Sequence, residues 1–325
     1  MPALNTPLVT PKLNLPNRLV FPAMSTSTAA PDGSVTDATL DFFRQRSRGF
    51  GLVVVEHSYV SAWGKAGPKM LSVSRDEDIP GLSSLTALLH ENGCQAHLQL
   101  DHGGGWAIPE LQSVLDPAKN PEGRRIAAAL TDEQLAQTVR DFASAAVRAR
   151  EAGFDGVQIK ACHVYLLGQF YSPLTNCRTQ GRYSGATFQG RIQLTLDVLD
   201  AVRRAVGPDY PVSVRFAVQD YDEHGSTLEE GIRAGKLLEE HGADILDLSG
   251  GPKYRYFHPT RKEPGWFGDD ALAIRRGLSI PVVVTGGVTA PEHAQVLLDR
   301  GCADLVGVCR AAVRDPLWAQ NALSI

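Results

Sequence analysis

The sequence predicts an α/β fold, a single (β/α)8 TIM barrel that spans residues 1–325 and carries extended loops after several strands. Eight short apolar runs rich in β-branched residues recur along the chain, and a segment with helical spacing follows each of them. Continuous rather than alternating hydrophobicity is typical of parallel strands covered by helices. The rival fold, an open doubly wound sheet, normally has a GxGxxG turn after its first strand, and "FPAMSTSTAAPDG" contains none.

The expected elements alternate along the whole chain. The expected strands are 18–24, 52–56, 94–100, 155–160, 211–216, 244–249, 280–285 and 303–309. The expected helices are 36–48, 79–91, 131–152, 187–206, 227–241, 269–276, 290–300 and 311–323. Capping sequences at Thr131, Thr227 and Thr289 predict helix starts, and glycines predict helix ends at 93, 153, 207, 242 and 301. Long loops are expected at 101–130, 161–186 and 250–268.

The composition indicates an ordinary globular protein and excludes several classes of partner. Hydrophobic residues make up 43% of the chain, and the net charge of -4 offers no basic surface for nucleic acid. Apolar runs are too short to cross a bilayer and the N-terminus lacks a signal peptide, so we expect a cytoplasmic protein without a membrane partner. The five cysteines are scattered and never in CxxC spacing, which predicts reduced thiols and no metal site. The sequence leaves open whether the chain forms a homo-oligomer.

Active sites of such barrels lie at the C-terminal ends of the strands. Reading those positions gives a set of hydrogen-bonding and small residues that should meet at one mouth: Met24, Ser25, Glu56, His57, Gln99, Asp101, His102, Lys160, His163, Tyr165, Arg215, Ser249, Gly250, Gly286, Gly287 and Arg310. Converging side chains of these types predict a binding or catalytic site.

The last two strands end in patterns that suit a phosphate. Gly286 and Gly287 in "TGGVTAPE" allow close backbone approach, and Arg310 in "GVCRAA" can form a charge-assisted fork. The alternative is that the glycines shape a turn and Arg310 caps a carbonyl. Arg215 lies inside the apolar strand "PVSVRFAV" and therefore needs an anionic or electron-rich partner, which could also be Asp220 or Glu56.

These motifs resemble the old yellow enzyme family of flavin-dependent ene reductases, and the resemblance runs essentially end to end. The stretches that carry it are "LPNRLVFPAMS", "LQLDHGG", "AGFDGVQIKACHVYLLGQFYSPLTNCRT", "VSVRFAVQDY", "VTGGVT" and "ADLVGVCRAAVRDPLW". The resemblance implies bound FMN, with NADPH or NADH as the reductant. The residues it implies around the flavin and its phosphate are Pro22, Ala23, Met24, Ser25, His57, Gln99, Arg215, Gly286, Gly287, Cys309 and Arg310.

The resemblance also implies a substrate site formed by Lys160, His163 and Tyr165. In the family, two side chains donate hydrogen bonds to the oxygen of an α,β-unsaturated substrate, and a tyrosine two residues further on protonates Cα. Lys160 stands here in place of the first histidine. The implied reaction is a ping-pong reduction in which NAD(P)H reduces FMN and hydride then passes from flavin N5 to Cβ, while Tyr165 supplies the proton.

Two alternatives remain for the role of Lys160, and two for the reaction. The lysine could extend its charged end to solvent, or its charge could favour a carboxylate as the acceptor group. The flavin protein could run the reverse, desaturating reaction. A cofactor-free barrel lyase could use Lys160 to form a Schiff base with a carbonyl substrate.

Overall fold

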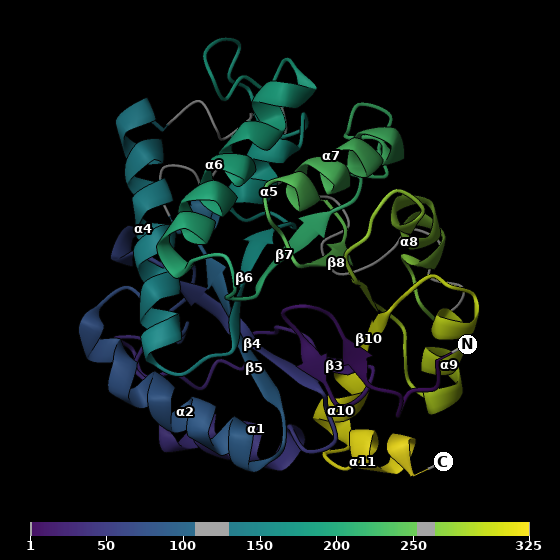
Figure 1. Cartoon of the computed structure of the whole chain (residues 1–325). Helices are drawn as coiled ribbons and strands as arrows, with labels where there is room; N and C mark the ends of the chain where they lie inside the picture. Colours follow the sequence, from purple (N-terminus) through teal and green to yellow (C-terminus); the bar gives the residue numbers. More distant parts are fainter. Residues whose placement is uncertain (1, 108–129, 252–263, 325) are drawn as a thin grey trace.

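A closed barrel of parallel strands forms the centre of the computed structural model, which describes residues 2–107, 130–251 and 264–324. The strands follow one another around the barrel in chain order, and the last pairs with the first. Helices surround the strands, as Figure 1 shows. The expected (β/α)8 barrel is therefore confirmed. The expected loops 101–130 and 250–268 lie partly outside the described residues.

Each barrel strand overlaps the apolar run that predicted it. The strands are β3 (Leu19–Phe21), β4 (Leu52–Tyr59), β5 (Gln95–Asp101), β6 (Gly156–Ala161), β7 (Val212–Ala217), β8 (Ile245–Ser249), β9 (Val282–Thr285) and β10 (Leu305–Gly307). Strand β4 extends beyond its expected end because its pairing with β5 shifts between Val55 and Ser58 and then continues to Tyr59.

The outer helices also follow the sequence prediction, with one division. They are α1 (Asp37–Arg46), α2 (Ile79–Glu91), α4 (Asp132–Glu151), α6 (Phe188–Val206), α7 (Leu228–Glu240), α8 (Gly268–Arg275), α9 (Pro291–Asp299), α10 (Arg310–Arg314) and α11 (Trp318–Leu323). The segment 311–323 was expected to be one helix. It is divided into α10 and α11 because Pro316 lacks the N–H that a continuous helix needs.

The capping predictions hold at two of three helix starts. The side chains of Thr131 and Thr227 each accept a hydrogen bond from the backbone N–H three residues later. The prediction at Thr289 is wrong, because Ala290 is the N-cap and α9 begins at Pro291, whose fixed φ suits the first helical position. The glycines expected at helix ends all have positive φ, between 66° and 93°.

A short hairpin closes the N-terminal end of the barrel, and the sequence patterns did not predict it. Its strands are β1 (Leu8–Val9) and β2 (Asn14–Leu15), which pair antiparallel. Leu13 and Leu15 pack in one apolar cluster with inward-facing residues of the barrel, among them Leu52, Val54 and Leu305. Since this end is filled by apolar side chains, the C-terminal ends of the strands form the open mouth.

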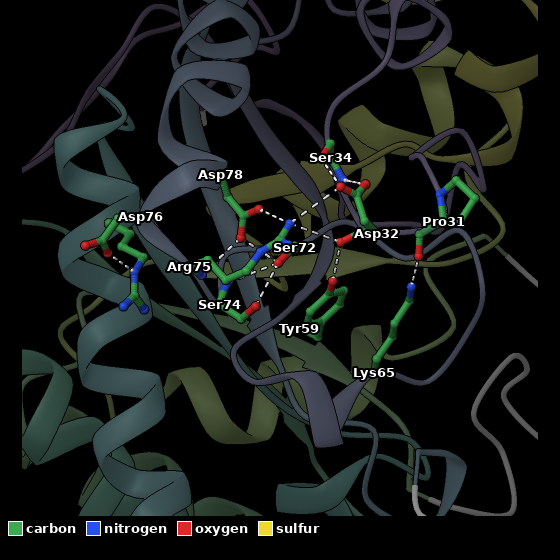
Figure 2. Close-up of polar contacts among 11 residues, drawn as sticks. Pro31, Asp32, Ser34, Tyr59, Lys65, Ser72, Ser74, Arg75, Asp76 and Asp78 are labelled. Carbon is green, nitrogen blue, oxygen red and sulfur yellow. Dashed lines mark hydrogen bonds and ion pairs between the residues drawn. The ribbon is translucent and has the colours of Figure 1, made fainter.

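A polar network ties the loops after β3 and β4 to each other beside this mouth (Figure 2). The Tyr59 hydroxyl donates to the backbone oxygen of Asp32 at 2.7 Å. Asp78 accepts from the Ser72 hydroxyl at 2.6 Å and from the Arg75 guanidinium at 2.9 Å. These hydrogen bonds connect the two loops on the outer side of the barrel strands.

Two general properties of the described part of the chain bear on the sequence predictions. No helix there is both long and apolar enough to span a membrane. The five cysteines are free, and Cys94, Cys162 and Cys302 are buried.

Candidate active site

A cavity of about 520 Å³ lies at the C-terminal mouth of the barrel. Its walls include most of the residues that the sequence predicted at this mouth: Ala23, Met24, Ser25, His57, Gln99, Lys160, His163, Tyr165, Arg215, Ser249, Gly286, Gly287, Cys309 and Arg310. Glu56, Asp101, His102 and Gly250 were also predicted there but are not among the lining residues. Pro22 is buried directly before this lining segment. The structure thus brings together in one cavity residues that are spread over most of the chain.

One end of the cavity combines two glycines with arginines. Gly286 and Gly287 have φ values of 138° and 69°, conformations that side-chain-bearing residues rarely adopt. A Cβ at Gly287 would lie 2.5 Å from Nε1 of Trp266, so the indole packs directly on the glycine backbone. The Arg310 guanidinium lies 5.1 Å from the Trp266 ring centroid, and Arg314 lines the same cavity. This end is positively charged and suits an anion.

Arg215 is held at the cavity by two acceptors, one in the loop after β3 and one on β8. Its Nη1 donates to the backbone oxygen of Ala23 at 2.9 Å, and its Nε lies 3.4 Å from Oδ2 of Asp247. Asp247 is the register partner of Arg215 on β8, and its side chain is 1% exposed. Burial raises the pKa of the Asp247 carboxyl, and the Arg215 charge opposes that shift. The alternative partners Asp220 and Glu56 form other contacts: Asp220 accepts from Ser172, and Glu56 accepts from Thr26.

A directional hydrogen-bond chain connects Asp247 to Gln99 through the barrel interior. Asp247 accepts from Nε2 of Gln158 at 3.3 Å, and Oε1 of Gln158 accepts from Nε2 of Gln99 at 2.6 Å. Because a carboxylate can only accept, it fixes the orientation of both amides. Gln99, which lines the cavity, thereby keeps its carbonyl oxygen and its second amide N–H for a ligand.

Glu56 fixes the loop that carries Ser25 at the cavity wall. Its carboxylate accepts from the backbone N–H of Thr26 at 2.5 Å and from the Thr26 hydroxyl at 2.7 Å. Burial raises the pKa of Glu56, and the two bonds from Thr26 oppose this shift. The backbone from Ala23 to Ser25 is thus held between the Glu56 contact on one side and the Arg215 contact on the other.

Lys160 is engaged in a buried ion pair. Its Nζ lies 3.1 Å from Oδ2 of Asp101, with side-chain exposures of 5% and 1%. The same ammonium lies 3.2 Å from the Tyr165 ring centroid, and Nδ1 of His57 is 3.1 Å from the same Asp101 oxygen. Burial works against ionisation of Asp101, yet Lys160 and His57 hold the pKa of this carboxyl below its usual range.

His163 and Tyr165 come from the turn between β6 and a short helix, α5 (Leu166–Tyr171). His163 has a φ of 60°, a strained conformation that is stabilised by contacts at the end of β8. Its backbone N–H donates to Gly250, and its Nε2 lies 2.7 Å from the Ser249 hydroxyl. The Tyr165 ring centroid lies 5.4 Å from that of His57 and 6.5 Å from that of His163. Tyr165 therefore lies close to both imidazoles.

Several residues of the site were not selected from the sequence as site residues. Asp247 is the buried partner of Arg215, and Trp266, Thr285 and Arg314 line the cavity. Asp101 was predicted as a strand-end residue of the mouth, but its pairing with Lys160 was not predicted. Asp247 had no comparable signal, because its pairing with Arg215 depends on the register of β7 and β8.

The residues at this mouth fit FMN, on observations independent of any likeness to other proteins. The arginine and glycine end suits a phosphate, and glycine is required at Gly287, where both the positive φ and the Trp266 contact exclude a side chain. The Oγ1 of Thr285, which lines the cavity, is buried and makes no hydrogen bond. A planar polar ligand with an anionic tail would use these groups.

Comparisons with known proteins agree with this geometry. The sequence profile of the NADH:flavin oxidoreductase / NADH oxidase family matches residues 3–324. An "NADH oxidase" of Thermoanaerobacter brockii is 35% identical over 94% of this chain, which spans 48% of that relative's length. An "NADPH dehydrogenase" of Halalkalibacterium halodurans is 30% identical over 95% of this chain and 90% of its own.

A solved structure shares the fold as well. The old yellow enzyme from Trypanosoma cruzi superposes with a TM-score of 0.80 at 24% identity, and the match covers 99% of this chain and 92% of that one. At this identity the likeness concerns the fold. The chain spans about half the length of the Thermoanaerobacter relative.

Proposed function

Because the chain belongs to the NADH:flavin oxidoreductase / NADH oxidase family, in keeping with the old yellow enzyme motifs, we propose that it is an FMN-dependent NAD(P)H oxidoreductase that reduces activated C=C bonds. The observation that carries the proposal is one cavity with an anion-binding end and a proton-donating end. Gly287 and Arg310 lie at the first end, and Tyr165 and His163 lie at the second.

The end of the cavity that contains the arginines and glycines would bind the cofactor. Gly286, Gly287 and Arg310 would bind the phosphate through backbone N–H groups and a guanidinium. Arg215 would place a cation beside the ring system, where a developing negative charge needs stabilisation. The remaining ring contacts would come from the other lining residues, Ala23, Met24, Ser25, His57, Gln99 and Cys309, with Pro22 fixing the backbone before them.

The substrate end would hold the carbonyl group of an α,β-unsaturated compound. Bound FMN would supply the hydride for Cβ, after its own reduction by NADPH or NADH. Tyr165 holds a phenolic proton at the cavity wall and would donate it to Cα. His163, oriented by Ser249, would donate a hydrogen bond to the carbonyl oxygen. Lys160 contributes to the same wall while it remains paired with Asp101.

The proposal can be tested anaerobically with the purified, FMN-loaded protein. We expect NADPH or NADH to bleach the flavin absorbance and 2-cyclohexenone to restore it. Bleaching without reoxidation by any enone, unsaturated acid or nitroalkene would contradict reduction of this substrate class. Reduction of the flavin by a saturated ketone, with release of the enone, would instead support the desaturating alternative.

The Schiff-base alternative is tested in the same preparation. An imine at Lys160 requires a neutral amine, whereas Nζ lies against the Asp101 carboxylate in a buried site. We therefore expect borohydride to trap no carbonyl substrate on Lys160, as judged by intact-protein mass spectrometry. A covalent adduct at that residue would support the lyase hypothesis instead.

A further inference from the structure

The ion pair of Lys160 with Asp101 changes the electrostatics of the substrate end. A lysine at the position of a substrate-binding histidine suggests a positive site that attracts carboxylates. In the structure, however, Asp101 contacts the ammonium at 3.1 Å, and both side chains are almost completely buried. Such a pair has no net charge, whichever partner holds the proton.

His57 also contacts Asp101, but it adds no charge to the pair. Burial lowers the pKa of its imidazole, and the nearby Lys160 charge lowers it further, so His57 is neutral near pH 7. Because Nδ1 lies 3.1 Å from the Asp101 carboxylate, the ring proton resides on Nδ1 and Nε2 retains its lone pair. The three groups together are therefore neutral, and one of them presents an acceptor.

The other positive charges at the cavity are not available to a carboxylate at the substrate end. Arg215 is paired with Asp247 on the neighbouring strand. Arg310 and Arg314 lie with Gly286 and Gly287 at the end assigned to the phosphate. A carboxylate placed beside Tyr165 would lose its hydration, would approach the negative charge of Asp101 and would find the nearest cation already paired.

We propose that Asp101 is a specificity-determining residue, which cancels the charge of Lys160 and so makes the substrate end bind neutral carbonyl acceptors in preference to carboxylates. The inference rests on the proposed function, because it assigns this end of the cavity to the substrate. Lys160 is then a positioning residue whose ammonium packs on the Tyr165 ring. Tyr165 and His163 are left to donate to a neutral oxygen.

The test is the substitution Asp101→Asn in the FMN-loaded protein. Asparagine has nearly the same shape and keeps an oxygen that can accept from Lys160, but it removes the negative charge. Binding of benzoate and of benzamide, a matched anionic and neutral pair, is measured by calorimetry at pH 7 without any turnover. We expect the wild-type protein to bind benzamide at least about tenfold more tightly than benzoate, and Asp101→Asn to reverse that preference.

Two further variants control for the fold and for the source of the effect. In Lys160→Met/Asp101→Asn the cation is also absent, so the gain in benzoate affinity should disappear. In Lys160→Met alone the Asp101 charge has lost its ion-pair partner, so benzoate should bind even more weakly relative to benzamide than in the wild type. This variant tests the inference if Asp101→Asn does not fold.

The outcomes separate this inference from the proposed function. Equal binding of benzoate and benzamide by the wild type, or an unchanged ratio in Asp101→Asn, would overturn the role of Asp101. We expect 2-cyclohexenone, but not cyclohexene-1-carboxylate, to reoxidise the flavin of the wild-type protein. In Asp101→Asn, we expect cyclohexene-1-carboxylate to reoxidise the flavin as well. If no unsaturated compound reoxidises the flavin, the proposed function fails while the binding ratio still decides the charge argument.

Discussion

The buried pair of Arg215 and Asp247 allows the stability of the barrel to be separated from its affinity for FMN. In Arg215→Met the long aliphatic side chain is retained, but Asp247 is left without its cation in a position that is 1% exposed. Breaking a buried pair in this way costs about 3–5 kcal/mol. We expect that loss in the free energy of unfolding of the apoprotein, measured by urea titration at pH 7.

The double variant Arg215→Met/Asp247→Asn removes both charges. Asparagine can still accept the hydrogen bond from Gln158, so the polar chain to Gln99 survives. The remaining deficit should be about 1 kcal/mol, chiefly from the lost donor to the Ala23 carbonyl. Most of the stability should therefore return.

The affinity for FMN should not return with the stability. A charged hydrogen bond contributes about 1.5–3 kcal/mol, so both Arg215 variants should bind FMN roughly 10- to 150-fold more weakly, measured by fluorescence titration. Trp266, which packs on the Gly287 backbone, provides an intrinsic fluorophore for this titration. Double and single variants of equal stability, or a double variant that binds FMN as tightly as the wild type, would refute the reasoning.

The loss of unfolding free energy in Arg215→Met should also depend on pH. Burial already raises the pKa of Asp247, and loss of the Arg215 charge raises it further. A folded state with the higher carboxyl pKa binds more protons than the unfolded state, so its stability falls as pH rises. Between the pKa of Asp247 in the folded wild type and its higher pKa in folded Arg215→Met, the deficit should grow by about 1.4 kcal/mol per pH unit, whereas the double variant has no carboxyl at this position to titrate.

Three further changes test other parts of the structure. Tyr165→Phe should slow flavin reoxidation by an enone by about 10²- to 10⁴-fold in stopped-flow traces, and a normal rate would exclude Tyr165 as the proton donor. Gly33→Ala should lower the melting temperature, since Gly33 has a φ of 91° and a Cβ there would lie 2.5 Å from the Tyr59 hydroxyl. Burial lowers the pKa of His97 to about 4, so its contribution to stability is present above pH 6.5 and is lost toward pH 4, at about 1.4 kcal/mol per pH unit. His97→Gln should flatten this acid slope, and an unchanged slope would contradict the assignment.

The barrel and its cavity could be predicted from the sequence because both depend on repeated local patterns. Each apolar run overlaps a strand, and positions just after the runs become cavity walls through the fold rule for parallel barrels. The hairpin β1–β2 could not be predicted in this way, since strands of two residues give no periodic signal. Helix α5 lies inside an expected loop. All six of its residues are buried, so its sequence shows no amphipathic pattern of a surface helix.

The ion pairs of the site were beyond prediction from one sequence. The pairing of Arg215 with Asp247 and of Lys160 with Asp101 depends on which residues face each other across adjacent or nearby strands. The register that decides this is set by the closed barrel as a whole. The prediction of strand cations was therefore sound, whereas their partners required the three-dimensional structure.

Closure of the barrel by β10 against β3 has a consequence for biosynthesis (Figure 1). Ala23 and Arg310, which lie near opposite ends of the chain, line the same cavity. During translation the pocket cannot exist until the last strand has left the ribosome. Flavin capture would then be a late event that only chains including β10 can complete, and chains that stop before β10 should stay colourless.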